Sequence, residues 1–210
     1  MITNQKMKEA LVKYAHMMEA GGFGNSYEGN ISARDGDLVY ISPSRTRKAT
    51  LTADKVAVVD MDGNQVDGPI KPSTELAMHL ACYKTRPDAQ AVIHSHSLYL
   101  NAYAMCHKDI DYPISHEFLA LFKKIPCAAY GRAGTDAIYA DAVRLLKTYD
   151  CVLLANHGSL LVAKTLDSAF ARLEAAEGLA RIFTVAHQIG TPGALPPEEI
   201  EFFLKKIPAN

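Results

Sequence analysis

Two short apolar runs that each lead into histidine place the strongest constraint on how this chain can fold. Residues 91–93 lead into His94 and His96, and residues 151–155 lead into His157. Because side chains alternate between the two faces of a strand, a strand that continues to His96 directs its two imidazoles to one face. If the second run ends beside the first, a third imidazole joins them. Three protein ligands with an open fourth position are the pattern of a catalytic zinc site.

The histidine spacing by itself leaves two interpretations open. A histidine at a strand end is often a hydrogen-bonded structural residue, whereas two imidazoles on one face beside a third form a partial metal cage. Two other His-x-His enzyme types are excluded. The metallo-β-lactamase pattern continues with an Asp-His pair, but residues 97–99 are Ser-Leu-Tyr. An amidohydrolase barrel carries its His-x-His pair on the first strand of a longer chain, whereas here the pair lies in the middle of a short chain.

Apolar periodicity and turn residues predict intermixed helices and strands. Pro72 favours a helix that begins at Ser73 or Thr74, with Ser73 as N-cap. We expect helices over residues 4–20, 73–84, 97–106, 114–123, 135–147, 167–188 and 198–206, and strands over residues 31–34, 38–41, 56–60, 91–95, 151–155 and 159–163. This order predicts α/β or α+β layers around a largely antiparallel or mixed sheet.

Length, charge and cysteine usage narrow the class of protein. A chain of 210 residues predicts a single domain over 1–210, with a C-terminal tail from about residue 191. The net charge of −1, without a basic block, gives no electrostatic support for a nucleic-acid or anionic-membrane partner. No apolar run approaches the roughly 20 residues that span a bilayer. Four scattered cysteines and an N-terminus without an apolar core predict reduced thiols in a cytoplasmic protein.

Glu75 lies in the first turn of the helix predicted after Pro72. A carboxylate there is favoured by the helix dipole, which is a common structural role. Beside a metal, the same carboxylate could act as a ligand and as a proton-transfer base. For that role, its pKa would need to lie closer to neutral than that of a free glutamate. We interpret His79, one turn further along, as structural.

Three turns rich in glycine and hydroxyl residues are spread along the first third of the chain. They comprise residues 29–32, 42–44 and 73–74. Each one alone is typical of a turn or a helix cap. Together they offer backbone N–H and hydroxyl donors of the kind that hold a phosphate without much net charge. A metal beside such donors indicates a phosphorylated substrate whose carbonyl is polarised.

These motifs resemble the class II (zinc-dependent) aldolase superfamily, which includes L-fuculose-1-phosphate aldolase, ribulose-5-phosphate 4-epimerase and the adducin head. The similarity is highest to the fuculose-phosphate aldolases and covers about residues 5–190. It rests on Gly29-Asn30-Ile31-Ser32-Ala33-Arg34, Ile41-Ser42-Pro43-Ser44, Pro72-Ser73-Thr74-Glu75, His94-Ser95-His96 and Asn156-His157-Gly158. The resemblance implies a three-layer α/β/α sandwich with a central, mostly antiparallel sheet. It also implies a homotetramer with active sites between subunits.

The resemblance also implies roles for individual residues. His94, His96 and His157 would hold the metal, and Glu75 would be both a fourth ligand and the catalytic acid/base. Three imidazoles and a carboxylate suit Zn²⁺, although Mn²⁺, Co²⁺ and Fe²⁺ also fit such a set. The residues expected to bind the substrate phosphate are Gly29, Asn30, Ser44, Arg45, Ser73 and Thr74.

Two positions depart from the family pattern. Arg45 stands where the fuculose-phosphate aldolases usually have glycine, and it could add a phosphate contact or crowd the pocket. Those aldolases also have a tyrosine proton donor, supplied by the neighbouring subunit, just after a histidine. Here Glu117 follows His116 in that segment, so His116 and Glu117 become the candidate proton donors.

The expected reaction is reversible cleavage of a ketose 1-phosphate to dihydroxyacetone phosphate and an aldehyde. L-Fuculose 1-phosphate or a related deoxy-pentulose or deoxy-hexulose phosphate is the expected substrate. A pentulose-phosphate 4-epimerase, a sugar-acid phosphate decarboxylase and a methylthioribulose-phosphate dehydratase remain alternatives within the superfamily. A non-enzymatic module like the adducin head is a further alternative, which the presence of all three histidines and Glu75 disfavours.

Overall fold

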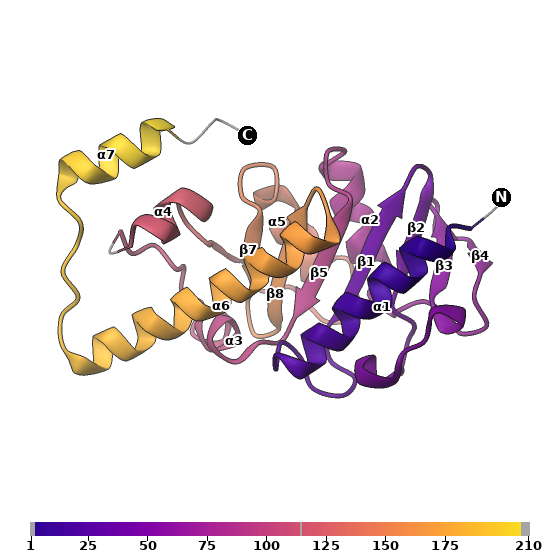
Figure 1. The fold of residues 1–210 in the computed structure, drawn as a ribbon. Coiled ribbons are helices and arrows are strands. Elements are labelled where there is room, and N and C mark those ends of the chain that lie inside the picture. Colours follow the sequence, from indigo (N-terminus) through magenta and orange to yellow (C-terminus); the bar gives the residue numbers. More distant parts are fainter. Residues whose placement is uncertain (1–2, 114, 207–210) are drawn as a thin grey trace.

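The computed structural model describes residues 3–113 and 115–206. These residues form one eight-stranded sheet with helices on both faces (Figure 1). The strand order is β4-β3-β2-β1-β5-β8-β7-β6, and every pairing is antiparallel except the parallel pair β6 and β7. The strands are β1 (Asn30–Asp35), β2 (Leu38–Ile41), β3 (Ala57–Asp60), β4 (Gln65–Asp67), β5 (Ala91–Ser95), β6 (Cys127–Ala128), β7 (Cys151–Leu154) and β8 (Gly158–Ala163).

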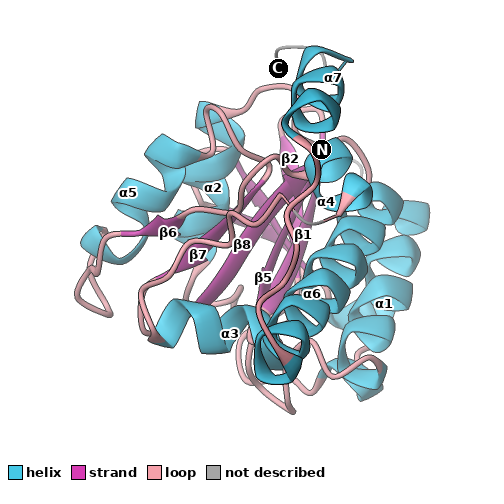
Figure 2. Cartoon of the chain, turned by 90° about the vertical axis from the view of Figure 1, so that its left-hand side faces the viewer, coloured by secondary structure: helices cyan, strands magenta, loops and turns pink. Residues whose placement is uncertain are grey.

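The helices make the two outer layers (Figure 2). Helices α1, α3, α4 and α6 cover one face of the sheet, and α2 and α5 cover the other. The α-helices are α1 (Gln5–Ala20), α2 (Leu76–Thr85), α3 (Leu98–Met105), α4 (His116–Leu121), α5 (Ala137–Leu145), α6 (Leu166–Ile189) and α7 (Pro197–Lys206), and two short 3₁₀ helices are η1 (Lys48–Thr50) and η2 (Ala53–Lys55). This arrangement confirms the predicted three-layer α/β/α sandwich.

Alternation along the central strands explains why both faces of the sheet are covered. In β5, Ile93 packs into the apolar layer beneath α1 and α6, whereas Val92 packs into the layer beneath α2 and α5. Strands whose successive residues are all buried must have a helix on each side. In β1, Ile31 joins the first layer, whereas Ser32 is a fully buried polar residue on the other side.

The predicted start of α2 is wrong by two or three residues. The helix begins at Leu76, with Glu75 as its N-cap residue, rather than at Ser73 or Thr74. Pro72 forms a β-bridge with Pro43, which holds this segment extended against the end of β2. Ser73 accepts a hydrogen bond from the Glu75 backbone N–H, so it closes a turn before the helix instead of capping it. Glu75 therefore lies just before the first turn of the helix instead of inside it.

The other predicted helices lie within about two residues of the observed ones. Two strands were missed, β4 and β6. Strand β4 is a polar edge strand, and β6 has only two residues, so neither carries a clear apolar alternation. The four cysteines form no disulfide. Over residues 3–113 and 115–206, no helix is long and apolar enough to cross a membrane.

The segment after α6 returns to pack against α4. It crosses in extended form to α7, which lies beside α4 in Figure 1. The backbone N–H of Leu195 donates to the carbonyl of Pro113, and the Phe203 ring lies 4.8 Å from the ring of His116. The predicted tail from about residue 191 is thus tied to the rest of the chain at α4.

Candidate metal centre and active site

Three imidazoles meet at one end of the central strands. His94 lies in β5, His96 follows the end of β5, and His157 lies in the turn between β7 and β8. The Nε2 atom of His94 is 2.9 Å from Nε2 of His96 and 3.0 Å from Nε2 of His157. The predicted convergence of these three residues is confirmed. Strand β8, and not the apolar strand β7, lies beside β5. His157 therefore reaches the cluster from the residue just before β8.

Two glycines allow the close backbone approaches around these imidazoles. A Cβ at Gly158 would lie 2.5 Å from the Ser95 carbonyl oxygen and 3.0 Å from Cε1 of His94. A Cβ at Gly29, whose φ is +69°, would lie 2.7 Å from the His94 carbonyl oxygen. Only glycine fits both positions without displacing backbone. Gly29 therefore sets the spacing of β1 and β5 in addition to lining the adjacent cavity described below.

His94 and His96 are neutral, the form of imidazole that binds a metal. Nδ1 of His94 lies 2.9 Å from the Ser159 carbonyl oxygen and donates to it, which leaves a lone pair on Nε2. Burial lowers the pKa of both His94 and His96 to about 4, so both rings are neutral at pH 7. A tetrahedral ion with Zn–N bonds of about 2.0 Å separates its nitrogens by about 3.3 Å. The two spacings from His94 Nε2, 2.9 and 3.0 Å, lie within about 0.4 Å of that value, so a small outward shift of the rings would seat such an ion.

The carboxylate of Glu75 completes the cluster. Its Oε1 lies 3.1 Å from Nε2 of His157, and its Oε2 lies 3.5 Å from Nε2 of His94. Burial raises the pKa of Glu75, but the nearby His94 and hydrogen bonds from His157 and Asn30 outweigh it, so the pKa lies below its usual range. This direction is opposite to the shift towards neutral that a proton-transfer role would need. The hydrogen bonds that His157 and Asn30 donate to the carboxylate stabilise its charged form.

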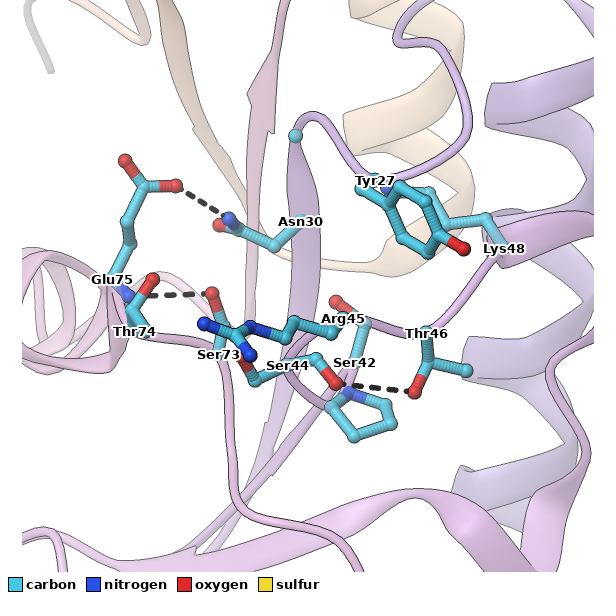
Figure 3. A pocket seen from close by; sticks show the side chains of 12 residues that line it. Tyr27, Asn30, Ser42, Ser44, Arg45, Thr46, Lys48, Ser73, Thr74 and Glu75 are labelled. Carbon is cyan, nitrogen blue, oxygen red and sulfur yellow. Dashed lines mark hydrogen bonds between the residues drawn. The ribbon is translucent and has the colours of Figure 1, made fainter.

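A cavity of about 290 Å³ opens on one side of Glu75, between the end of β2 and the start of α2. Figure 3 shows the hydroxyls of Ser44, Ser73 and Thr74 around it, with the guanidinium of Arg45 directed towards the side that holds Ser73 and Thr74. Gly29 and Asn30 also line the cavity. The structure thus brings together all six residues that the sequence assigned to phosphate binding.

Two basic residues line this cavity, and only one of them was identified from the sequence. Arg45 is exposed and has a φ of +53°, so it keeps the left-handed backbone that would favour glycine at this position. Lys48 was missed. Its side chain is buried, and its Nζ donates to the Glu28 carbonyl oxygen at 2.5 Å. Burial lowers the pKa of Lys48. No local motif marks it, because it reaches the cavity from the separate helix η1.

The side chain of Asn30 is engaged at both ends. Its Nδ2 donates to Oε2 of Glu75 at 2.6 Å, and its Oδ1 lies 2.5 Å from Nε2 of His79 (Figure 3 shows the first of these bonds). A phosphate can only accept from this amide, so it would share or displace the Nδ2 contact with Glu75 and leave the Oδ1 contact with His79 in place. The phosphate-binding role of Asn30 therefore stays a prediction, while its contact with Glu75 is a feature that the sequence did not indicate.

A second cavity of about 380 Å³ lies on the other side of Glu75 and His157. Its walls mix apolar side chains with a few polar groups. Thr74 and Glu75 line both cavities, so the carboxylate stands between them. The remaining lining residues are Ala77, Met78, Ala133, Gly134, Thr135, Asp136, Ile138 and Tyr139.

His116 and Glu117, the candidate proton donors, are not brought to this site within one chain. Both are exposed on α4, and neither lines either cavity. His116 stacks on Phe203, and Glu117 accepts a hydrogen bond from the Ser115 hydroxyl at 2.7 Å. Their role as proton donors stays a prediction that needs a second subunit.

Comparison with known proteins agrees with this geometry. Residues 9–184 match the family described as Class II Aldolase and Adducin N-terminal domain. A 5-deoxy-D-ribulose 1-phosphate aldolase from Bacillus thuringiensis is 34% identical over 205 residues, covering 97% of this chain and 96% of its own length. The L-fuculose phosphate aldolase of Escherichia coli K12 is 29% identical over 205 residues, covering 96% of this chain and 94% of its own length.

Solved structures show the same fold. An L-fuculose 1-phosphate aldolase superposes with a TM-score of 0.89 and is 32% identical, covering 98% of this chain and 97% of its own. YgbL from Klebsiella pneumoniae, described as a putative aldolase/epimerase/decarboxylase, gives a TM-score of 0.86 at 26% identity, covering 97% of this chain and 100% of its own.

Proposed function

Because the chain belongs to the class II aldolase and adducin N-terminal domain family, we propose that it is a metal-dependent aldolase acting on a ketose 1-phosphate. The reaction is reversible cleavage to dihydroxyacetone phosphate and an aldehyde. The observation that carries the proposal is the place of Glu75. Its carboxylate lies against the three converging imidazoles and separates a cavity lined by hydroxyls and cations from a second, more apolar cavity.

The first cavity has the chemistry of a phosphate site. Hydroxyl donors come from Ser44, Ser73 and Thr74, and the charge of a phosphate is balanced by Arg45 and Lys48. A desolvated ammonium such as that of Lys48 is costly to keep unless an anion compensates it. A bound phosphate dianion supplies that compensation. Binding the phosphate here places the rest of the ketose across Glu75 towards the second cavity.

The imidazoles and the carboxylate have separate roles in the reaction. A divalent ion held by His94, His96 and His157 would stabilise the negative charge that develops on the ketose oxygen as the carbon–carbon bond breaks. Glu75 holds and moves the proton. Cleavage moves one proton from the hydroxyl on the carbon that becomes the aldehyde to the carbon that has lost its bond partner. Once the substrate displaces its carboxylate from the imidazoles, Glu75 is placed to take up that proton and deliver it to this carbon.

The second cavity supports a short aldehyde with an apolar end. Ala77, Met78 and Ile138 give it apolar walls, and Thr135 and Asp136 give it hydroxyl and carboxylate groups. A deoxy sugar presents both kinds of surface, a methyl terminus and neighbouring hydroxyls. We therefore propose L-fuculose 1-phosphate or a related deoxy-pentulose or deoxy-hexulose 1-phosphate as substrate. The 5-deoxy-D-ribulose 1-phosphate aldolase among the relatives supports this choice.

We further propose Zn²⁺ as the ion, a homotetramer as the working form and the cytoplasm as its location. The imidazole-rich ligand set supports Zn²⁺. Because His116 and Glu117 lie outside both cavities, they can act as proton donors only at the site of another subunit, as the proposed homotetramer allows. Free cysteines, two of them fully buried, support a reducing compartment.

A substrate panel with a matched variant pair tests the proposed reaction. Purified protein loaded with Zn²⁺ is incubated with C5 and C6 ketose 1-phosphates, and dihydroxyacetone phosphate is measured as it forms. Glu75→Gln should fold and bind metal but lose about 10²–10⁴-fold in kcat. Glu174→Gln, a change of the same kind at an exposed position of α6, should leave kcat unchanged. If Glu75→Gln turns over at the wild-type rate, Glu75 is not the proton carrier.

A further inference from the structure

A line of hydrogen bonds runs from Glu75 into the interior between β1 and α2. From Asn30, it continues to His79, whose Nε2 lies 2.5 Å from Asn30 Oδ1. Nδ1 of His79 lies 2.7 Å from the hydroxyl of Ser32, and that hydroxyl lies 2.8 Å from the hydroxyl of Tyr83. All of these residues except Glu75 are buried.

The spacing of the residues explains why they meet. Asn30 and Ser32 are two apart in β1 and therefore face the same side of the sheet. His79 and Tyr83 are four apart in α2 and therefore share one face of that helix, the face that covers this side of the sheet. Glu75 precedes His79 by another four residues. One polar row on a strand thus meets one polar row on a helix.

The direction of donation along this line is fixed by chemistry. The carboxylate of Glu75 only accepts, so Asn30 turns its Nδ2 towards it and its Oδ1 towards His79. Oδ1 only accepts, so Nε2 of His79 carries the proton. A neutral imidazole, which burial ensures, then has a lone pair on Nδ1, so the Ser32 hydroxyl donates to it. The Tyr83 hydroxyl donates to Ser32, and every donor points towards Glu75.

We propose that His79 is a positioning residue that holds the amide of Asn30 in the one orientation that binds the carboxylate of Glu75. An asparagine amide can turn over, because its oxygen and nitrogen are nearly equal in size. Turned over, it would present its oxygen to the carboxylate, and the two acceptors would repel each other. The Nε2–H of His79 excludes that orientation. The proposal rests on the proposed role of Glu75 in the cleavage reaction.

If His79 had only a structural role, we would expect a different result from its substitution. If His79 only filled space, a leucine of similar volume beside Met78 and Tyr83 would serve as well. With leucine, however, Asn30 Oδ1 loses its hydrogen-bond donor, and the Ser32 hydroxyl loses its acceptor and keeps only its contact with Tyr83. Glutamine keeps an amide N–H close to the place of Nε2. The two substitutions therefore separate the hydrogen bond from the packing.

The variant test compares His79→Leu with His79→Gln in the full chain loaded with Zn²⁺. We expect His79→Leu to lower kcat by about 10–100-fold, the usual effect of losing a residue that orients a metal-site group. Its KM should change by less than about threefold, and its zinc content should stay at the wild-type value. His79→Gln should keep kcat within about threefold of wild type. Equal losses in both variants, or no loss in either, would overturn the proposal.

A spectroscopic measurement tests the orientation without relying on activity. In ¹⁵N-histidine-labelled protein, long-range proton–nitrogen correlation distinguishes the two neutral tautomers, and His79 should carry its proton on Nε2. A proton on Nδ1 would reverse the line and refute the proposal even in an active enzyme. If His79→Leu does not fold, the smaller change Ser32→Ala takes its place. Ser32→Ala should alter the His79 signals and lower kcat at least threefold. Wild-type signals and kcat in Ser32→Ala would likewise contradict it.

Discussion

Replacing Gly158 with alanine would test whether the backbone spacing at the histidine cluster governs metal binding. The new Cβ would lie 2.5 Å from the carbonyl oxygen of Ser95, and Cβ atoms essentially never approach another atom within 3.0 Å. Strands β5 and β8 must therefore separate by at least about 0.5 Å at this point. The same Cβ lies 3.0 Å from Cε1 of His94, so the displacement acts directly on that imidazole.

The displacement exceeds what a metal site tolerates. Metal–ligand distances hold within about 0.2 Å, and disturbing the groups that orient ligands costs about 10–100-fold in affinity. A loss of that size is equivalent to about 1.4–2.7 kcal/mol less stabilisation by a saturating ion. The metal-free protein should also lose about 1–3 kcal/mol of stability, because the extra methyl overfills a packed contact.

Chemical denaturation with and without Zn²⁺ measures both quantities. Gly178→Ala is the matched control, since Gly178 is exposed in α6 and a Cβ there meets nothing within 4 Å. It should stabilise the protein by about 0.5–1 kcal/mol and leave the zinc-induced stabilisation unchanged. If Gly158→Ala shows the wild-type zinc-induced stabilisation, the proposed dependence of the metal site on this contact is refuted.

Two further predictions follow from individual residues. Arg45→Gly should raise stability by about 1 kcal/mol, because glycine adopts the φ of +53° without strain, yet raise KM for a ketose 1-phosphate, because the guanidinium is lost. Thermal unfolding and steady-state kinetics check the two effects separately, and an unchanged KM would contradict the phosphate contact. Stability of the metal-free protein should fall as the pH falls from about 6.5 to about 4, because unfolded His79 takes up a proton that the buried ring, with a pKa of about 4, resists. His94 and His96, whose pKa values are also about 4, contribute to the same dependence. Urea titrations across this window should show a slope for His79→Gln that is smaller by about 1 kcal/mol per pH unit, and an unchanged slope would exclude His79 as a contributor.

Local sequence rules were sufficient for the imidazole cluster. Side-chain alternation placed His94 and His96 together, and the apolar run before His157 indicated a strand end near them. The order of the strands was beyond those rules. Strand β8, not β7, lies beside β5, and this follows from which hairpin packs against the central strands.

Residues that act through distant partners were harder to predict. Lys48 reaches its cavity from a 3₁₀ helix, and no spacing rule links it to Ser73 or Thr74. His79 shows regular spacing with Glu75, but its partner across the sheet is visible only once β1 and α2 are packed together. The low pKa of Glu75 could not be predicted either, because the number of donors around a carboxylate cannot be counted from sequence.

Metal content and its link to turnover show whether the three imidazoles hold a catalytic ion. Protein purified without added chelator is analysed for divalent ions and assayed for release of dihydroxyacetone phosphate, before and after removal of the ion and after its return. We predict one ion per chain, held by His94, His96 and His157, with activity that disappears on chelation and recovers when Zn²⁺ is restored. A metal-free protein that cleaves ketose 1-phosphates at the full rate would contradict it.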